Sequence, residues 1–163
     1  MKLNLGCGKD IREGYINLDF KKAKGVDIVH NLNEYPYPFK ENTFDEVFCD
    51  RVLELLDNLV RAMEEIHRIC KPGARVRIRV PYYNCKGNSN DPLQRRSFNS
   101  STLDFLEAGY ETSHYTNVRF KILKKRLVAT RLGKIFPSFI RERASYVFGE
   151  IISSIWFELE VVK

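Results

Sequence analysis

The first eight residues place the strongest constraint on the fold. Lys2 to Leu5 is a short run that ends directly in Gly6-Cys7-Gly8. This pattern predicts a buried strand that enters a tight turn, because glycine adopts backbone conformations that other residues avoid. In an open sheet of parallel strands, ligands bind beside the carboxyl ends of the strands. We therefore expect an α/β fold with a ligand site close to the start of the chain.

Strand-like and helix-like patterns alternate along the remaining residues. Strands are expected at residues 2–5, 15–20, 26–30, 44–49, 74–80, 118–129 and 156–162. Helices are expected at 57–71 with Asp57 as the N-cap, at 100–108, and from Pro137 to about Ile152. This order predicts a Rossmann-like, largely parallel seven-stranded sheet with helices on both faces and an antiparallel final strand.

The length and the cysteines bound the kind of protein. The 163 residues suit a single domain over 1–163, in which residues from about 131 to 155 form a basic, amphipathic helical insertion before the last strand. The four cysteines show no C-x-x-C spacing, so we expect no metal site and no disulfide framework. Reduced thiols and the lack of a leader-like segment after Met1 favour a cytoplasmic location.

Asp19 is the first candidate binding residue beyond the glycines. It ends the second expected strand, eleven residues after Gly8. A dinucleotide fingerprint needs a third small residue where this chain has Ile11, and an acid about twenty residues further on. A cofactor with a pyrophosphate is therefore disfavoured. A nucleoside without phosphates fits better, with Asp19 accepting the two ribose hydroxyl protons.

Several motifs together resemble the class I methyltransferases that use S-adenosylmethionine, in particular a compact branch with a shortened first helix. The motifs are Leu3–Gly8, Gly14–Asp19, Pro36–Phe39 followed by Phe44–Val47, Glu65–Gly73 and Arg79–Tyr83. The resemblance extends from Leu3 to about Leu106. It implies methyl transfer to an oxygen or nitrogen of an unidentified acceptor, for which a small molecule or a saccharide is favoured.

The resemblance also implies residue roles at the cofactor. The residues concerned are Gly6, Cys7 and Gly8 at the methionine and ribose, Asp19 at the ribose, Asn31 and Leu32 at the adenine, and Cys49, Asp50 and Arg51 at the sulfonium. Two positions depart from the branch, which commonly has histidines where this chain has Leu55 and Gln94. A non-catalytic protein that binds S-adenosylmethionine therefore stays open as an alternative.

Three residues are candidate catalytic groups. Asp50 follows the fourth expected strand, where its carboxylate would lie near the positive sulfur; a helix-capping role is an equal alternative. Tyr82 ends the fifth strand and belongs either to the core or to the substrate site. His114 is the histidine with a functional interpretation, whereas His67 is expected on a solvated helix face.

The net charge of +6 is concentrated in one segment. Residues 119–143 contain nine basic residues and a single acid, Glu142. Such a segment binds a nucleic-acid backbone, contacts an anionic membrane surface, or is simply a solvated face. The sequence slightly favours the solvated face, and RNA methylation through this segment is an alternative function. The oligomeric state is not indicated.

Overall fold

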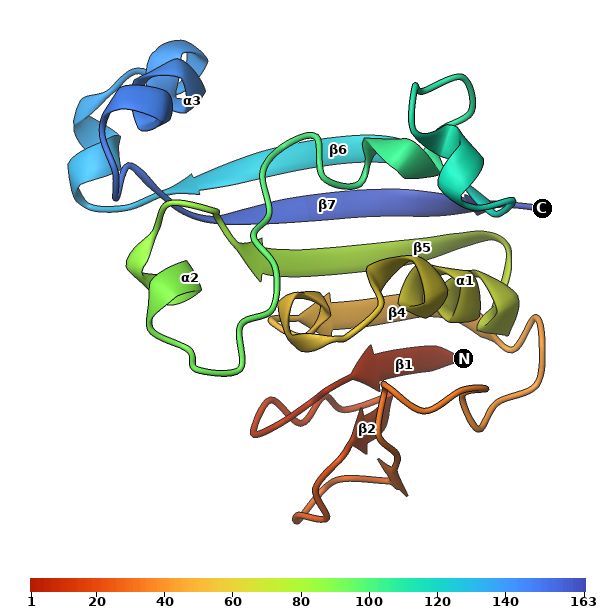
Figure 1. Ribbon diagram of the computed structural model, residues 1–163. Helices are drawn as coiled ribbons and strands as arrows, with labels where there is room; N and C mark the ends of the chain where they lie inside the picture. Colours follow the sequence, from red (N-terminus) through yellow and green to blue (C-terminus); the bar gives the residue numbers. More distant parts are fainter.

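Seven strands form one sheet in the computed structural model, which describes residues 1–163 (Figure 1). Along the chain they are β1 (Lys2–Leu5), β2 (Ile16–Asp19), β3 (Ile28–Val29), β4 (Phe44–Asp50), β5 (Cys70–Pro81), β6 (Arg119–Ala129) and β7 (Ile152–Val162). The order across the sheet is β3-β2-β1-β4-β5-β7-β6. The first five strands in this order are parallel, and β7 runs antiparallel to both β5 and β6. The predicted Rossmann-like, largely parallel sheet is confirmed.

One long helix follows the middle of the sheet. This helix, α1 (Leu59–Ile69), buries Ala62, Met63 and Ile66 completely against the strands. Its N-cap is Asn58, whose side-chain oxygen accepts the Arg61 backbone N–H at 3.0 Å. The prediction of Asp57 as the cap was wrong by one residue. The helix also ends before Pro72-Gly73, because β5 already begins at Cys70.

The other helices are short. They are α2 (Lys86–Ser89), α3 (Ser138–Val147) and the 3₁₀ turns η1 (Leu53–Leu55), η2 (Asp104–Leu106), η3 (Ser113–Tyr115) and η4 (Leu132–Ile135). The helix predicted at 100–108 is absent: Asn99 Oδ1 accepts the Ser101 N–H at 2.9 Å, and such side-chain bonds compete with helix formation. No helix has the length and apolar character needed to cross a membrane.

The third predicted helix is shorter than expected. It ends at Val147 instead of about Ile152, and Glu150 has a φ of 60° just before β7 begins. The apolar residues from Ile140 to Ile155 therefore do not share one face of a helix. Ile151 and Ile155 are completely buried, whereas 77% of Val147 is exposed.

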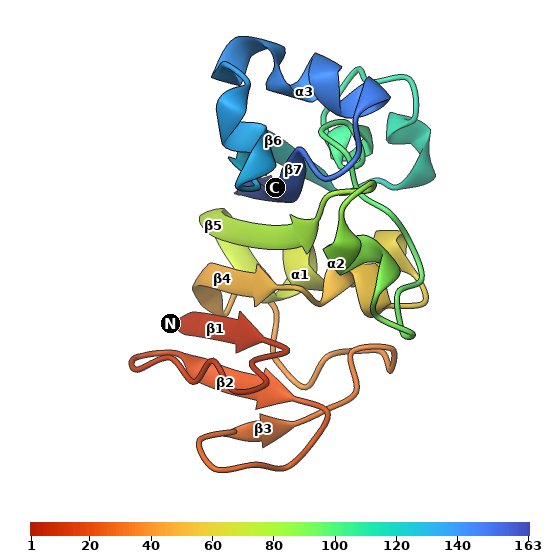
Figure 2. The same ribbon diagram turned by 90° about the vertical axis from the view of Figure 1, so that its left-hand side faces the viewer.

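The two faces of the sheet differ in composition. On the face called here the apolar face, Val76, Ile78 and Val80 of β5 are completely buried, and α1 with the segment 82–118 covers it (Figures 1 and 2). On the opposite, polar face, β5 carries Arg75, Arg77 and Arg79. No helix lies over this face at β1, β4, β5 or β7 (Figure 2).

The prediction of helices on both faces was therefore wrong. The residues that join β1 to β2 number ten, and those that join β2 to β3 number eight. A crossover with its own helix needs a dozen or more residues. These two connections are too short to place helices on the polar face. The polar face instead pairs charges across the strands, with Arg75 against Glu160 at 3.3 Å and Arg77 against Glu46 at 3.2 Å.

Candidate functional site

A cleft of about 280 Å³ opens at the carboxyl ends of β1 to β4. It brings together residues from five parts of the chain. The lining residues are Gly6, Asp19, Phe20, His30, Asn31, Leu32, Asn33, Arg51, Val52, Leu55, Leu56, Leu93 and Arg95. This is the location that the glycine turn predicts, because the connections between parallel strands leave a crevice at the carboxyl edge.

The glycine turn is held by tight packing. Gly6 has a φ of +62°, and a Cβ on this residue would lie 2.3 Å from the Val52 Cγ2 atom. Gly8 has a φ of +52°, but no atom lies within 4 Å of where its Cβ would stand. Glycine at position 6 therefore serves close packing as well as backbone conformation. A larger residue there would displace Val52, which itself lines the cleft.

Asp19 lies at the end of β2 and links two loops. Its Oδ2 accepts the Gly8 N–H at 2.8 Å, and its Oδ1 accepts the Lys21 N–H at 3.0 Å. A carboxylate oxygen has more than one lone pair, so both oxygens can accept a further hydroxyl. Asp19 is 7% exposed and lines the cleft. The backbone thus orients this carboxylate before any ligand arrives.

The loop after β3 supplies the opposite wall. Asn31 Oδ1 accepts the Asn33 N–H at 3.1 Å, and its amide nitrogen donates to Glu34 at 3.2 Å. The Leu32 carbonyl accepts the buried Tyr37 hydroxyl at 3.2 Å. Both Asn31 and Leu32 face the cleft. This wall combines one polar amide with an apolar side chain.

Four predicted binding residues do not line the cleft. Cys7 and Cys49 are buried, and burial raises the pKa of both thiols. Gly8 contributes its backbone N–H to Asp19. Asp50 lies in the polar face, where the Arg79 guanidinium donates to both of its oxygens, at 2.6 Å for Nε. The strand alternation explains the positions of Cys49 and Asp50, because successive side chains of β4 point to opposite faces.

The three predicted catalytic residues are not brought together. Tyr82 is completely buried, and burial raises the pKa of its phenol to about 12. His114 lies in η3 near the amino end of β6, at the edge of the sheet opposite the cleft (Figure 1). Its ring instead bonds the Glu111 carbonyl at 3.1 Å. With Asp50 held by Arg79, none of the three presents a free group to the cleft.

Glu54 is the residue that the sequence reasoning missed. It lies in η1, four residues after the end of β4, is 2% exposed, and its Oε2 has no hydrogen-bond partner. Burial raises the pKa of this carboxyl to about 7. The Arg95 and Arg96 N–H groups both donate to the Glu54 carbonyl and so fix the segment after α2 over it. An acid between two leucines, Leu53 and Leu55, was the available signal.

Comparisons with known proteins agree with this arrangement. Residues 7–78 match the family model described as "Methyltransferase domain". The human mitochondrial arginine-hydroxylase NDUFAF5 is 36% identical over 89 residues, which are 44% of this chain and 26% of that protein. The chain spans about a third or less of the length of the curated relatives that it matches.

Solved structures resemble the whole chain at low identity. A SAM-dependent methyltransferase from Archaeoglobus fulgidus aligns with a TM-score of 0.69 and 16% identity, over 98% of this chain and 85% of that one. Phosphoethanolamine N-methyltransferase 2 from Haemonchus contortus, in complex with S-adenosyl-L-methionine, aligns with a TM-score of 0.65 and 15% identity, over 99% and 48%. At these identities the likeness establishes the fold.

Proposed function

We propose, from the premise that this chain belongs to the class I S-adenosylmethionine-dependent methyltransferases, that its cleft binds S-adenosylmethionine and that the protein methylates an oxygen or nitrogen of an acceptor. The observation that carries the proposal is the joint presence of Gly6, Asp19, Asn31 and Leu32 in one cleft. These residues come from three successive turns at the carboxyl edge of the sheet.

The residues of the cleft fit a nucleoside with a sulfonium side chain. Asp19 would accept the ribose hydroxyls, since its oxygens retain lone pairs. Asn31 and Leu32 would border the adenine, and Gly6 would face the ribose and methionine side. Val52 and Leu55 provide apolar contact.

For methyl transfer the protein needs chiefly to position the acceptor and to remove its proton. The cofactor supplies a methyl group already activated on a positive sulfur. The protein must then hold an acceptor in line and take its proton if the acceptor is a hydroxyl or an amine. We assign the proton to Glu54, which is itself buried but lies between the cleft residues Val52 and Leu55 in the chain, and whose pKa of about 7 suits a base near neutral pH. Asp50 is a weaker candidate, since Arg79 already uses both of its oxygens.

The acceptor would enter beside Leu93 and Arg95, which form the rim of the cleft. We retain a small molecule or a saccharide as the acceptor, in keeping with the cleft volume of about 280 Å³. We also retain a cytoplasmic location, with which the four free, buried cysteines agree.

RNA methylation is the second candidate. Lys124 and Arg126 of β6 lie with Arg77 around Trp156 in a hollow of about 190 Å³ on the polar face. An aromatic ring among cations is a common feature of single-stranded nucleic-acid sites. However, Glu158 also lines this hollow, and Lys125 lies on the other face, paired with Asp104. The basic segment is therefore divided between surfaces, and we place this candidate second.

Calorimetry with S-adenosylhomocysteine tests the proposal. We expect micromolar affinity for the wild type and a loss of about 1–3 kcal/mol in Asp19→Ala, the typical cost of removing one buried hydrogen-bond partner. Asp10→Ala is the matched control, because Asp10 is an exposed acid two residues beyond Gly8 and does not line the cleft. A folded wild-type protein that binds neither S-adenosylmethionine nor S-adenosylhomocysteine would refute the proposal.

A further inference from the structure

Exposed apolar side chains are concentrated in one short part of the molecule. Seven of the fifteen large hydrophobic residues with exposed side chains lie between residues 132 and 148. They are Leu132, Ile135, Phe139, Ile140, Tyr146, Val147 and Phe148. We call residues 131–149 the α3 arm. A patch of this kind marks a binding surface more often than it occurs by chance on a monomer.

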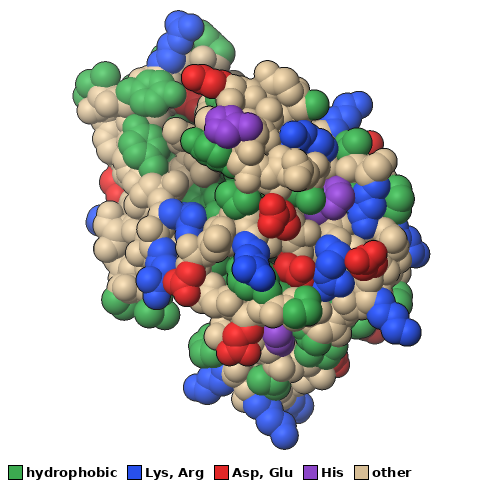
Figure 3. Space-filling view, turned by 45° about the vertical axis from the view of Figure 1, so that its right-hand side comes forward, with side chains coloured by type: hydrophobic (Ala, Val, Ile, Leu, Met, Phe, Trp, Pro, Cys, Tyr) green, Lys and Arg blue, Asp and Glu red, His purple; other side chains and the backbone are tan.

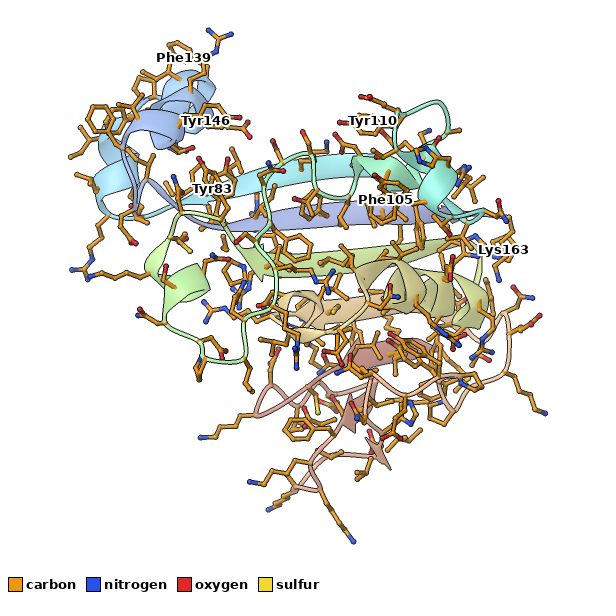
Figure 4. All side chains as sticks on the ribbon, in the orientation of Figure 1. Tyr83, Phe105, Tyr110, Phe139, Tyr146 and Lys163 are labelled. Carbon is orange, nitrogen blue, oxygen red and sulfur yellow. The ribbon has the colours of Figure 1, made fainter.

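The helix in the arm turns its apolar side away from the protein. Phe139 and Tyr146 are seven residues apart, which places them on one side of a helix, and they are 83% and 65% exposed (Figure 4). The opposite side is polar and points inward. Ser145 is 1% exposed there, and Arg141 donates to the Gly133 and Phe136 carbonyls at 3.0 Å. Figure 3 shows the hydrophobic side chains gathered over α3 at the upper left.

The exposed charges of the arm are all positive. Arg131, Lys134 and Arg143 are exposed. The one acid of the arm, Glu142, is partly buried, with its Oε1 3.4 Å from the Tyr82 hydroxyl. An outward surface of aromatic and aliphatic side chains with interspersed arginine and lysine matches the interface of an anionic bilayer, with its apolar interior and negative headgroups.

We propose that the α3 arm docks on the surface of an anionic lipid bilayer. The arm projects from a corner of the sheet, so its exposed side chains can reach a flat interface (Figures 1 and 2). In a two-fold dimer formed through the arm, the same patch of each copy would face that of the other. The three exposed cations of one arm would then lie close to the three of its partner and repel them. The charge of the arm therefore favours lipid over a second copy.

Docking would also orient the candidate cleft. The Asn84 amide donates to the Ser145 carbonyl at 2.6 Å, and the Asn84 carbonyl accepts the Glu150 N–H at 3.3 Å. These bonds fix the arm to the segment after β5, at the same edge of the sheet as the carboxyl ends of β1 and β4 (Figure 1). A bilayer bound to the arm would lie near the edge where the cleft opens. The docking proposal does not depend on methyl transfer.

Cosedimentation with vesicles tests the docking. We expect binding to vesicles of phosphatidylcholine and phosphatidylglycerol in equal parts, and at least about tenfold weaker binding to pure phosphatidylcholine, since each basic residue near an anionic surface strengthens binding about fivefold. The double variant Phe139→Ser/Val147→Ser should lose about tenfold or more of the binding, because both side chains would enter the acyl boundary. Both are exposed, so the fold should survive.

Tyr110→Ser is the matched control: this residue is 42% exposed near the opposite edge of the sheet and should not affect vesicle binding (Figure 4). The proposal would be overturned if the wild-type protein bound to neither type of vesicle, or if the double variant bound as tightly as the wild type. Light scattering that shows a wild-type dimer and a monomeric double variant would assign the arm to a second copy instead. The affinity of the double variant for S-adenosylhomocysteine should equal that of the wild type. This measurement distinguishes a loss of vesicle binding from a loss of cofactor binding.

Discussion

The two faces of the sheet differ in how far their side chains are buried, and two adjacent residues of β7 show the contrast. Phe157 is completely buried on the apolar face, where it pairs with Ile78. Trp156 is partly exposed on the polar face, with the Arg79 and Arg126 guanidinium groups 5.2 and 5.9 Å from its ring. One face is stabilised by apolar packing, and the other by cross-strand ion pairs and stacked cations.

This difference teaches that a largely parallel sheet does not need helices on both sides if its strands alternate. Sheets covered on both faces have strands that are almost continuously apolar. Here β5 alternates strictly between arginine and apolar residues from Arg75 to Val80. Near β1 and β2, the loop after the glycine turn provides a partial cover, with the Arg12 guanidinium 3.3 Å from the centre of the Phe48 ring.

Substitution of the two adjacent aromatic residues should give the largest contrast. Phe157→Ala should lower the free energy of unfolding by about 3–5 kcal/mol, because it leaves a cavity in the core. Trp156→Ala should cost about 1 kcal/mol or less, the value of exposed cation–π contacts. Urea denaturation of both variants measures the difference. Equal losses of unfolding free energy in the two variants would mean that Trp156 is buried by further packing on the polar face in solution.

Glu54 is buried, and its buried carboxyl should make the stability of the protein depend on pH. The pKa of this carboxyl is raised from 4.5 to about 7, so its contribution to stability is fully present below about pH 4.5 and is lost as the pH rises through about 7. The free energy of unfolding of Glu54→Gln should therefore equal that of the wild type at low pH. At pH 8 it should exceed the wild-type value by up to about 3 kcal/mol, since one pKa unit equals about 1.4 kcal/mol.

Denaturation curves of both proteins from pH 4.5 to pH 8 provide the measurement. A parallel pH profile in the variant would show that Glu54 is solvated or paired in solution. In that case the assignment of the acceptor's proton to Glu54 would also lose its basis.

Removal of one charge from the polar face should have the smallest effect. Arg77 is exposed and pairs with Glu46 at 3.2 Å and Glu158 at 4.0 Å. Exposed ion pairs contribute little, so Arg77→Ala should change the free energy of unfolding by about 0.5 kcal/mol or less, and high salt should reduce the difference further. A thermal melt at low and high salt checks both points. A loss as large as that of Phe157→Ala would contradict the description of this face as solvated.

The cleft was predictable where short segments define it. Gly6, Asp19, Asn31 and Leu32 each lie at the end of a strand or within three residues of it, and parallel strands bring such positions to one edge. Leu93 and Arg95 were not predictable as parts of the cleft, because they arrive from a loop that begins after the fifth strand. Asp50 was misplaced for a related reason: its position at the end of β4 is local, but its orientation depends on Arg79 in the neighbouring strand.

By itself, the sequence determined the alternation of strands, the glycine turn, the acid at Asp19 and the α/β order, because these depend on backbone conformation and on the period of apolar residues over a few positions. The tertiary structure alone decided which face stays without helices, where Asp50 and His114 lie, and which way α3 turns its apolar side. Those outcomes depend on the pairing of distant strands and on the length of the connections between them. Phe139 and Val147 form an apolar pattern of the kind seen in a core helix, and only the position of the arm beyond the edge of the sheet exposes them.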